Sequence, residues 1–266
     1  MRLDGEVLAD DGALSKVPRA TLAFWAVKIL ATTVGETGGD ALSMTLNLGY
    51  AVSTLIFLGF FCITATAQVA SRRYHPVLYW AVVVATTTVG TTTSDYFDRT
   101  LGLGYVKSSA ILLCAVVGVL LVWRLSTGAV AVDRVTSRTD ETFYWLTILV
   151  SNTLGTALGD FVATTTGLGF ERGALVFATL LAIVAAAYLL PRVPKALLFW
   201  AAYVLTRPLG ATLGDTLTKA HSDGGLAMNR ITSSLVLGAA MVVLVAMTSL
   251  RKREPEPVAA QRGVIV

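Results

Sequence analysis

Four stretches of the chain decide its fold, and each runs from a Trp through a Gly to an Asp at one fixed spacing. They read WAVKILATTVGETGGD at 25–40, WAVVVATTTVGTTTSD at 80–95, WLTILVSNTLGTALGD at 145–160 and WAAYVLTRPLGATLGD at 200–215. All four are rich in apolar residues. An ionisable side chain at membrane depth is costly and by default marks a functional site. The repeated Asp therefore predicts a site to which all four repeats contribute.

The composition of the whole chain favours a membrane protein. Of its 266 residues, 55% are hydrophobic and only 14% are charged, with a mean hydropathy of +0.69. Soluble domains usually carry about 25% charged residues. After each Asp comes a turn and then a second apolar run of about 20 residues, which is long enough to cross a bilayer. The first three turns share a Leu-Gly-aromatic sequence, whereas the fourth has diverged: Leu48-Gly49-Tyr50, Leu103-Gly104-Tyr105, Leu168-Gly169-Phe170 and His221–Gly225.

We therefore predict an all-α integral membrane protein with eight transmembrane helices. They form four parallel helical-hairpin repeats with pseudo-symmetry about the membrane normal. The predicted spans are 21–45, 50–70, 77–100, 106–126, 142–165, 171–190, 197–219 and 228–250.

The interval between the second and third repeats is longer than the other two, which predicts a linker between two halves. The predicted parts are a cytoplasmic N-terminal segment at 1–20, membrane half 1 at 21–126, a cytoplasmic linker at 127–141, membrane half 2 at 142–250 and a disordered cytoplasmic tail at 251–266.

The basic residues predict the orientation. Most of the 21 Lys and Arg residues fall in the segments on the side of the two termini, and loops rich in Lys and Arg stay in the cytoplasm. We therefore expect a multi-pass protein of the inner (plasma) membrane with both termini cytoplasmic. The positive net charge is then a topology signal, and we expect no nucleic-acid partner. The opposite loops carry only Arg99, Lys107, Arg172, Lys219 and Arg230. The charged residues near the outer turns are interpreted as ordinary solvated loop charges: Asp98, Arg99, Glu171, Arg172, Lys219 and Asp223.

The tandem two-span units resemble a family of bacterial membrane proteins defined by four copies of a two-span repeat of unknown function. Its members are described as uncharacterised membrane-anchored proteins. The resemblance covers residues 21–250 and rests on the repeat pattern with Trp25, Trp80, Trp145 and Trp200. It implies the eight-span architecture and brings no activity, so function has to be inferred from the residues.

The predicted cation- and proton-binding residues are five acids. Four carboxylates held close together cannot all stay ionised without a proton, a cation or a basic partner. Such a site couples metal to protons, because metal binding expels protons. The string Glu36-Thr-Gly-Gly-Asp40, present in this form only once, also resembles the acidic motifs of small cation exporters. The five acids are Asp40, Asp95, Asp160, Asp215 and Glu36.

Hydroxyl and amide side chains crowd the same stretches. Oxygen ligands suit hard cations such as Mg²⁺, Ca²⁺ or Mn²⁺, and the absence of His and Cys from the motif argues against zinc or copper. The alternative is that these side chains bond the carbonyls of their own helix. The predicted path-lining residues are Thr33, Thr37, Thr88, Thr91, Asn152, Thr156 and Thr212.

The glycines near each Asp permit two readings. Small residues four apart allow close helix packing, whereas Gly-rich segments can also unwind a helix at a transport site. Pro208 favours a kink in the fourth repeat. The residues predicted to pack or break the helices are Gly35, Gly39, Gly90, Gly155, Gly159, Gly210 and Gly214.

Two basic residues lie within the predicted spans. Lys28 is close enough to the interface to extend to the cytoplasmic surface, and Arg207 is predicted to pair with Asp160 or Asp40 as a countercharge. The four repeated Trp residues are expected at the membrane interface, with packing between repeats as the alternative.

The leading functional hypothesis is a secondary transporter that exports a hard metal cation, divalent or trivalent, in exchange for protons. A cation channel with an Asp-lined pore is the first alternative. A non-transporting scaffold or receptor is the second. No enzyme motif occurs, so we expect no enzyme and no cofactor apart from a transported cation. The expected partners are the lipid bilayer, the cation and protons, for a monomer or a homodimer.

Overall fold

The computed structural model of the chain describes residues 18, 20–71, 74–130, 135, 137–190 and 193–251. These residues form α-helices and no strand, which confirms the all-helical prediction. Most of the predicted N-terminal segment, part of the linker and the tail from residue 252 lie outside the described residues. The helices are α1 (Leu22–Asp40), α2 (Gly49–Ala70), α3 (Pro76–Asp95), α4 (Tyr105–Thr127), α5 (Arg138–Asp160), α6 (Phe170–Ala187), α7 (Lys195–Thr218) and α8 (Arg230–Arg251).

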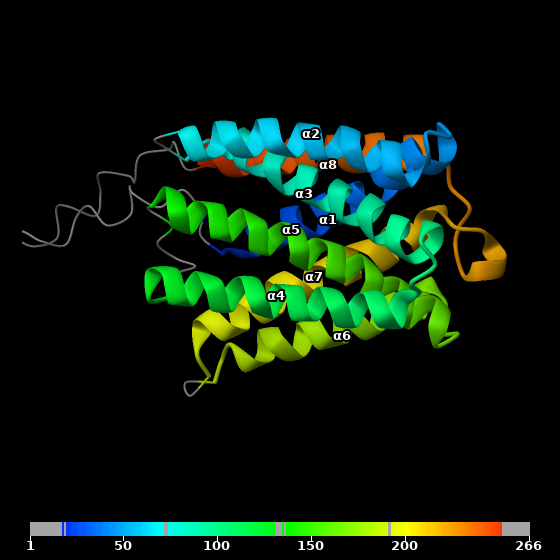
Figure 1. Cartoon of the computed structure of the whole chain (residues 1–266). Coiled ribbons are helices and arrows are strands. Elements are labelled where there is room, and N and C mark those ends of the chain that lie inside the picture. The colour runs from blue at the N-terminus through cyan, green and yellow to red at the C-terminus, as the bar shows by residue number, and fades with distance from the viewer. Residues whose placement is uncertain are drawn as a thin grey trace, which may run out of the picture.

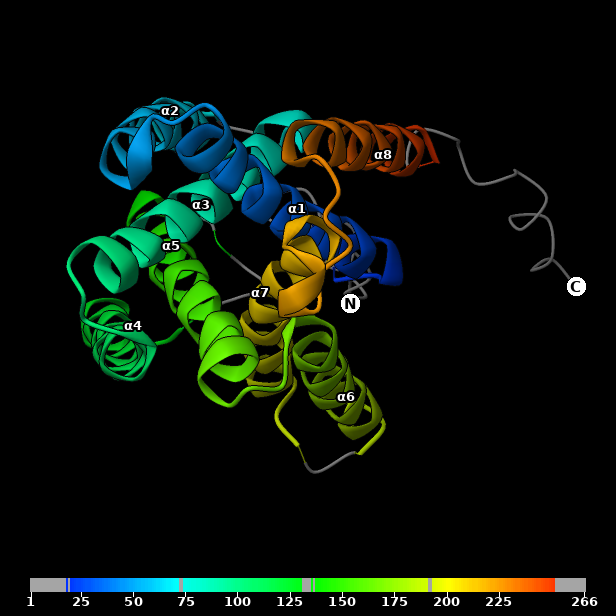
Figure 2. The ribbon, with the colours of Figure 1, turned by 90° about the vertical axis from the view of Figure 1, so that its right-hand side faces the viewer.

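The odd-numbered helices form a closed inner ring. Helix α1 packs on α3, α3 on α5, α5 on α7 and α7 on α1, whereas the even-numbered helices lie outside the ring (Figures 1 and 2). The inner helices are the ones that carry the Trp-to-Asp stretches. The ring therefore places the four Asp residues at one end of the bundle and the four Trp residues at the other.

Each outer helix packs mainly on the inner helix of the next repeat. Helix α2 lies against α3, α4 against α5, α6 against α7, and α8 closes the circle against α1. The two helices of one repeat are joined by a turn, as the sequence predicts, but they do not form a packed hairpin of their own. The repeats are thus interlocked around the ring.

Local sequence explains where the helices begin. Thr21 caps α1 because its hydroxyl accepts a hydrogen bond from the backbone N–H of Phe24, and Ser137 caps α5 in the same way. Pro76 occupies the first turn of α3, where its missing N–H costs nothing. The Leu-Gly-aromatic turns need a residue with positive φ, a conformation that Gly adopts readily: Gly49, Gly104 and Gly169 have φ of 73°, 75° and 78°.

The inner helices continue through the Gly-rich segment without a break. The α-helix runs up to Asp40, Asp95 and Asp160, and a π-helical turn follows each of these residues. In the fourth repeat α7 passes Pro208 and extends to Thr218 without such a turn. The helices are therefore not unwound at the glycines, although unwinding is one of the two roles considered for these residues, and the irregularity comes directly after the Asp. Such π turns are frequent at functional sites.

An aromatic layer closes the Trp end of the ring. The aromatic residue before each Trp packs on the Trp of the next repeat, with ring centroids 5.4–6.2 Å apart. The pairs are Phe24 with Trp80, Tyr79 with Trp145, Tyr144 with Trp200 and Phe199 with Trp25. Trp80 and Trp145 are buried, and Trp25 and Trp200 are partly buried. The four Trp residues therefore pack between repeats, which is the alternative role that the sequence allows for them.

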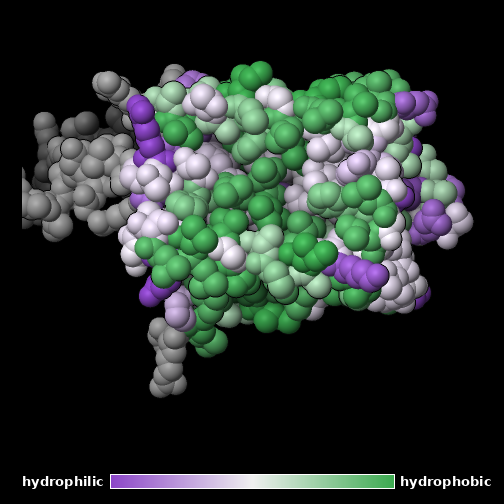
Figure 3. Space-filling view, viewed as in Figure 1, coloured by the Kyte–Doolittle hydropathy of each residue, from purple (hydrophilic) through white to green (hydrophobic). Residues whose placement is uncertain are grey.

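The outer surface of the bundle is apolar along its length. Figure 3 shows a broad hydrophobic region between two ends that carry the hydrophilic residues. Among the described residues, five helices are long and apolar enough to cross a membrane, four of them outer helices: Gly49–Ala70, Tyr105–Thr127, Arg138–Thr165, Phe170–Ala187 and Arg230–Leu250.

Candidate functional site

The four repeated Asp residues are buried at the same end of the inner ring. Each is the last residue before a π turn or lies in the last turn of its helix, and none is more than 2% exposed. A buried carboxylate needs a partner charge, because desolvation of an unpaired ion costs several kcal/mol even after relaxation, by order of magnitude. The structure supplies that charge from two basic residues.

Arg99 joins the carboxylates of the second and third repeats. Its Nε lies 3.1 Å from Asp95 Oδ1, and its Nη2 lies 3.3 Å from Asp160 Oδ2. The guanidinium also donates to the hydroxyl groups of Tyr50 at 3.3 Å and Tyr105 at 3.2 Å, which come from the outer helices α2 and α4. One planar cation thus contacts two carboxylates and two phenols.

Lys219 joins the carboxylates of the fourth and first repeats. Its Nζ lies 2.7 Å from Asp40 Oδ2 and 3.0 Å from Asp215 Oδ1. Arg230 adds a weaker ion pair, with its Nε 3.6 Å from Asp40 Oδ2. The four Asp residues therefore form two pairs, and one base bridges each pair. The bridging bases come from the second and the fourth repeat.

The sequence interpretation missed these two bases. Arg99 and Lys219 were expected to be solvated loop charges, but the side chain of Lys219 is 9% exposed and that of Arg99 is 29% exposed. A signal was present, because both residues lie four positions after the repeated Asp and so face it across one helical turn. The equivalent residues of the first and third repeats are Met44 and Thr164, which carry no charge.

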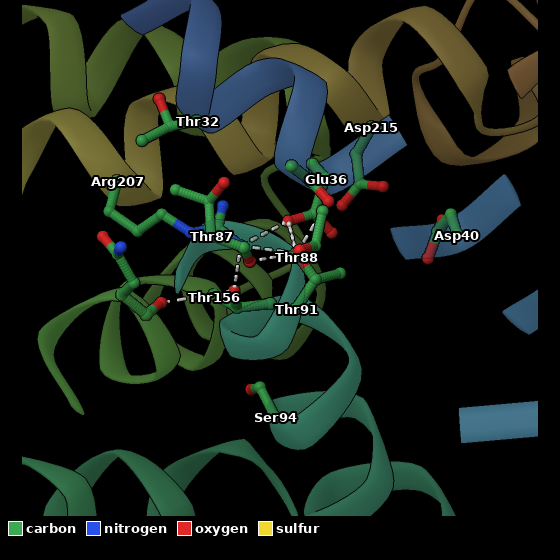
Figure 4. Close-up of polar contacts among 12 residues, drawn as sticks. Thr32, Glu36, Asp40, Thr87, Thr88, Thr91, Ser94, Thr156, Arg207 and Asp215 are labelled. Atoms are coloured by element: carbon green, nitrogen blue, oxygen red, sulfur yellow. Dashed lines mark hydrogen bonds and ion pairs between the residues drawn. The ribbon is translucent and has the colours of Figure 1, made fainter. Parts of the chain in front are cut away.

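A further ion pair, that of Arg207 with Glu36, lies between the four inner helices (Figure 4). The buried Arg207 donates from Nη2 to Glu36 Oε2 at 3.0 Å and to the hydroxyls of Thr91 at 2.6 Å and Thr156 at 2.5 Å. All four inner helices contribute to this contact, since these residues come from α7, α1, α3 and α5. The prediction that Arg207 pairs with Asp160 or Asp40 is wrong. The guanidinium pairs with Glu36, which lies one helical turn before Asp40 in α1.

Lys28 is buried at the Trp end of the ring axis. Its Nζ lies 4.2 Å from the centre of the Tyr203 ring and has no hydrogen-bond partner among the described residues. The expectation that Lys28 extends to the surface is wrong, because the aromatic layer encloses it. A cation–π contact stabilises an ammonium by up to about 2 kcal/mol in a desolvated position.

The predicted path-lining residues divide into two groups. Thr91 and Thr156 accept from Arg207, and Asn152 donates from Nδ2 to Thr86 Oγ1 at 2.9 Å, so these three link helices. The others bond carbonyls one turn back in their own helix, as the alternative reading of the hydroxyls predicts. They are Thr33, Thr37, Thr88 and Thr212, of which Thr37 also accepts a hydrogen bond from Ser234 of α8 at 2.8 Å.

The repeated Gly residues set the spacing of the ring. A Cβ on the Gly of one repeat would overlap the residue three positions before the Gly of the next repeat, and this holds around the whole circle. The contacts are Gly35 with Thr87, Gly90 with Asn152, Gly155 with Arg207 and Gly210 with Thr32.

The second Gly of a repeat packs in the same direction. Cβ atoms there would lie 3.0 Å from Thr91 at Gly39, 3.4 Å from Ala211 at Gly159 and 2.9 Å from Glu36 at Gly214. The glycines therefore permit close packing, one of the two roles predicted for them.

A cavity of about 890 Å³ opens above the carboxylate pairs. Arg99 and Lys219 both line it, so the two bridging bases separate the cavity from the Asp side chains behind them. Loops of the second, third and fourth repeats form the remaining wall. The lining includes Arg99, Tyr105, Phe170, Glu171, Lys219 and Asp223.

The arrangement suits the exchange of single positive charges. One base bridges each Asp pair, and another monovalent cation can replace that base without a change in the charge of the pair, whereas a single proton neutralises only one of the two carboxylates. Among the described residues no group of three or more His, Cys, Asp or Glu side chains is placed to hold a metal ion. The acids lie in pairs.

Comparison with known proteins bears on the repeats. A family model described as Repeat of Unknown Function (DUF347) matches the chain four times, over residues 23–74, 78–129, 143–193 and 198–254. Each match covers one inner helix and the outer helix that follows it. No curated protein and no solved structure matches the chain.

Proposed function

This chain belongs to the DUF347 repeat family, as the sequence resemblance indicates, and because the family's description assigns no activity, we propose a function from the site itself. The protein is a secondary transporter that couples the movement of a cation to that of protons. The observation that carries this proposal is the pairing of four buried carboxylates, two to a base, beneath a cavity.

The proposal places the protein in the bacterial inner membrane, with eight spans and both termini cytoplasmic. The apolar outer helices and the hydrophobic girdle of Figure 3 support it. The inner helices are less apolar because they face one another and not lipid. Polar residues inside membrane bundles usually face the bundle interior or a water-filled cavity, as these do.

In the proposed cycle the bridging bases act as resident cations. A cation that enters the cavity displaces a base from its carboxylate pair, or a proton neutralises one carboxylate and weakens its hold on the base. Cation and proton compete for the same oxygens, which couples their movements. At the Trp end the aromatic layer covers the axis, so passage of the cation between the cytoplasm and the carboxylates requires the ring to open there.

The cargo expected from the sequence was a hard metal cation. Carboxylate and hydroxyl oxygens support a cation in general. The paired arrangement of the acids and the bases already bound to them give less support to a metal ion that needs several ligands. The proposal therefore specifies a cation, and a metal ion becomes one arm of the test.

A cation channel fits the structure less well. The side chain of Arg207 lies across the axis and holds Glu36, Thr91 and Thr156, so a fixed positive charge sits in the path that a permeating cation would take. A repulsive charge in a narrow pore excludes cations.

Reconstitution of the purified protein in proteoliposomes tests the proposal. We expect a proton gradient to drive saturable cation accumulation, measured with Mn²⁺ and with guanidinium as cargo and with an internal pH dye. Asp95→Asn and Asp160→Asn should abolish it. Asp140→Asn, at the opposite end of α5, is the matched control and should retain it. Full coupled flux in all four variants of the repeated Asp residues would overturn the proposal.

A further inference from the structure

The carboxylate pair of Asp95 and Asp160 already holds a guanidinium group, that of Arg99. The two ion pairs of 3.1 and 3.3 Å are supplemented by the hydroxyls of Tyr50 and Tyr105. Two carboxylates and two phenol hydroxyls around one planar cation make a built site for that chemistry, because four oxygen atoms face the N–H groups of one guanidinium and the two carboxylates supply charge-assisted contacts.

We infer that the Asp95–Asp160 pair is the cargo site and that its cargo is an organic cation with a guanidinium or primary ammonium head. This inference rests on the proposed function and specifies its substrate class. The cargo replaces Arg99 charge for charge, since both carry one positive charge, and the two carboxylates remain neutralised to the same degree throughout the exchange.

The space above the pair fits a small organic molecule. The cavity of about 890 Å³ is in the range of about 300–1,000 Å³ that small-molecule pockets occupy, and a bare metal ion needs no such volume. Its wall includes the aromatic residues Tyr105 and Phe170 and the acids Glu171 and Asp223, together with the bases Arg99, Arg172 and Lys219. An organic cation would therefore find acidic and aromatic contacts within a lining that also carries positive charge.

The Asp95–Asp160 pair also retains a free acceptor. Asp95 is 1% exposed, and its Oδ2 has neither a hydrogen bond nor an ion pair within the part of the chain that the structure describes. A buried carboxylate oxygen without a donor is costly. A cargo head group with several N–H donors would satisfy it.

Arg99 is the base that can leave its pair. Its side chain is 29% exposed at the cavity, whereas that of Lys219 is 9% exposed. The backbone of Lys219 is also fixed on both sides, since its N–H donates to the Asp215 carbonyl at 2.8 Å and its carbonyl accepts from Ala227 at 2.9 Å. The Asp40–Asp215 pair therefore keeps its base while the Asp95–Asp160 pair exchanges it.

Equilibrium binding of radiolabelled guanidinium to the full-length protein in detergent tests the inference. We expect saturable binding to the unmodified protein, and at least tenfold weaker binding to Asp95→Asn and to Asp160→Asn. Asp140→Asn, remote from the cavity, should bind within twofold of the unmodified protein. Mn²⁺ should not compete at equal ionic strength.

The decisive variant is Arg99→Ala. If Arg99 competes with the cargo, its removal tightens guanidinium binding at least tenfold, whereas a purely structural Arg99 would leave binding unchanged or weaker. Should Arg99→Ala fail to fold, Arg99→Gln carries the same comparison, and its thermal stability should rise with added guanidinium chloride and not with NaCl. Unchanged or weaker binding in the folded variant would overturn the inference, as would an absence of saturable binding to the unmodified protein.

Binding in detergent needs no gradient, so the two proposals fail separately. Guanidinium binding without any proton-coupled flux would leave this site assignment standing and remove the transport function. Proton-coupled Mn²⁺ flux without guanidinium binding would do the reverse.

Discussion

The two ends of the inner ring differ in symmetry. At the Trp end the same aromatic contact recurs in all four repeats, from Phe24 on Trp80 around to Phe199 on Trp25. At the Asp end the carboxylate recurs four times, but a base accompanies it only in the second and fourth repeats, so the charges fall into two pairs. The repeats therefore pack on one another in the same way, and they differ mainly in the charged residues at the Asp end.

The largest effect should come from the buried base. We expect Lys219→Met to cost about 3–5 kcal/mol of unfolding free energy, because it leaves Asp40 and Asp215 buried without their bridging cation. Thermal denaturation in detergent measures the loss. Lys107→Met, on an exposed position of α4, is the control.

The same experiment compares the two pairs. Adding Asp40→Asn and Asp215→Asn to Lys219→Met should restore most of the stability, since no unpaired charge then remains. Arg99→Met should cost less than Lys219→Met, because the Arg99 side chain is the more exposed of the two bases and its ion pairs are more strongly screened by solvent. Equal losses for the two bases would contradict the asymmetry between them.

Substitution of a glycine in the inner ring tests how tightly the four inner helices pack. A Cβ at Gly90 would lie 2.9 Å from the backbone carbonyl carbon of Asn152, which cannot move aside as a side chain can. We expect Gly90→Ala to destabilise the protein by about 1–3 kcal/mol through overpacking. Gly59→Ala on α2, where a Cβ would meet nothing within 4 Å, should be neutral or stabilising. Equal stability of the two variants would argue against tight ring packing.

The smallest effect should come from the Trp end. The hydroxyls of Tyr79 and Tyr144 share a buried hydrogen bond of 2.8 Å. Tyr79→Phe removes it and keeps the ring contact with Trp145, so we expect a loss of about 1 kcal/mol. Cation flux in proteoliposomes should be unchanged, because the change does not touch the charged end. A large loss of flux with normal stability would give these tyrosines a part in transport.

Much of the fold follows from the sequence because the repeats carry it. The recurrence of Trp, Gly and Asp predicts equivalent helices, and turns such as Leu48-Gly49-Tyr50 set their ends close to where the structure has them. The convergence of the four Asp residues at one end follows from the same equivalence. The sequence of one repeat does not show which helix of another repeat it packs against. The packing of α2 on α3, and not on α1, could therefore not be predicted.

The site was only partly predictable because its selectivity lies in departures from the repeat. Glu36 and Arg207 each stand where the other repeats have uncharged residues, and the sequence shows that both are exceptional without showing that they meet. Arg99 and Lys219 occupy equivalent positions after Asp, but their place near a turn resembled that of a solvated loop charge. Each of them lies between two carboxylates because the packing of the inner helices brings the Asp of another repeat beside it.

The packing of the outer helix α8 on α1 has a consequence for biosynthesis. Helix α1 acquires its outer neighbour only when α8 has been made, so its buried face waits through the synthesis of the six helices between them. A product truncated before α8 would leave polar groups of α1 without that cover, among them the Thr37 hydroxyl that accepts a hydrogen bond from Ser234.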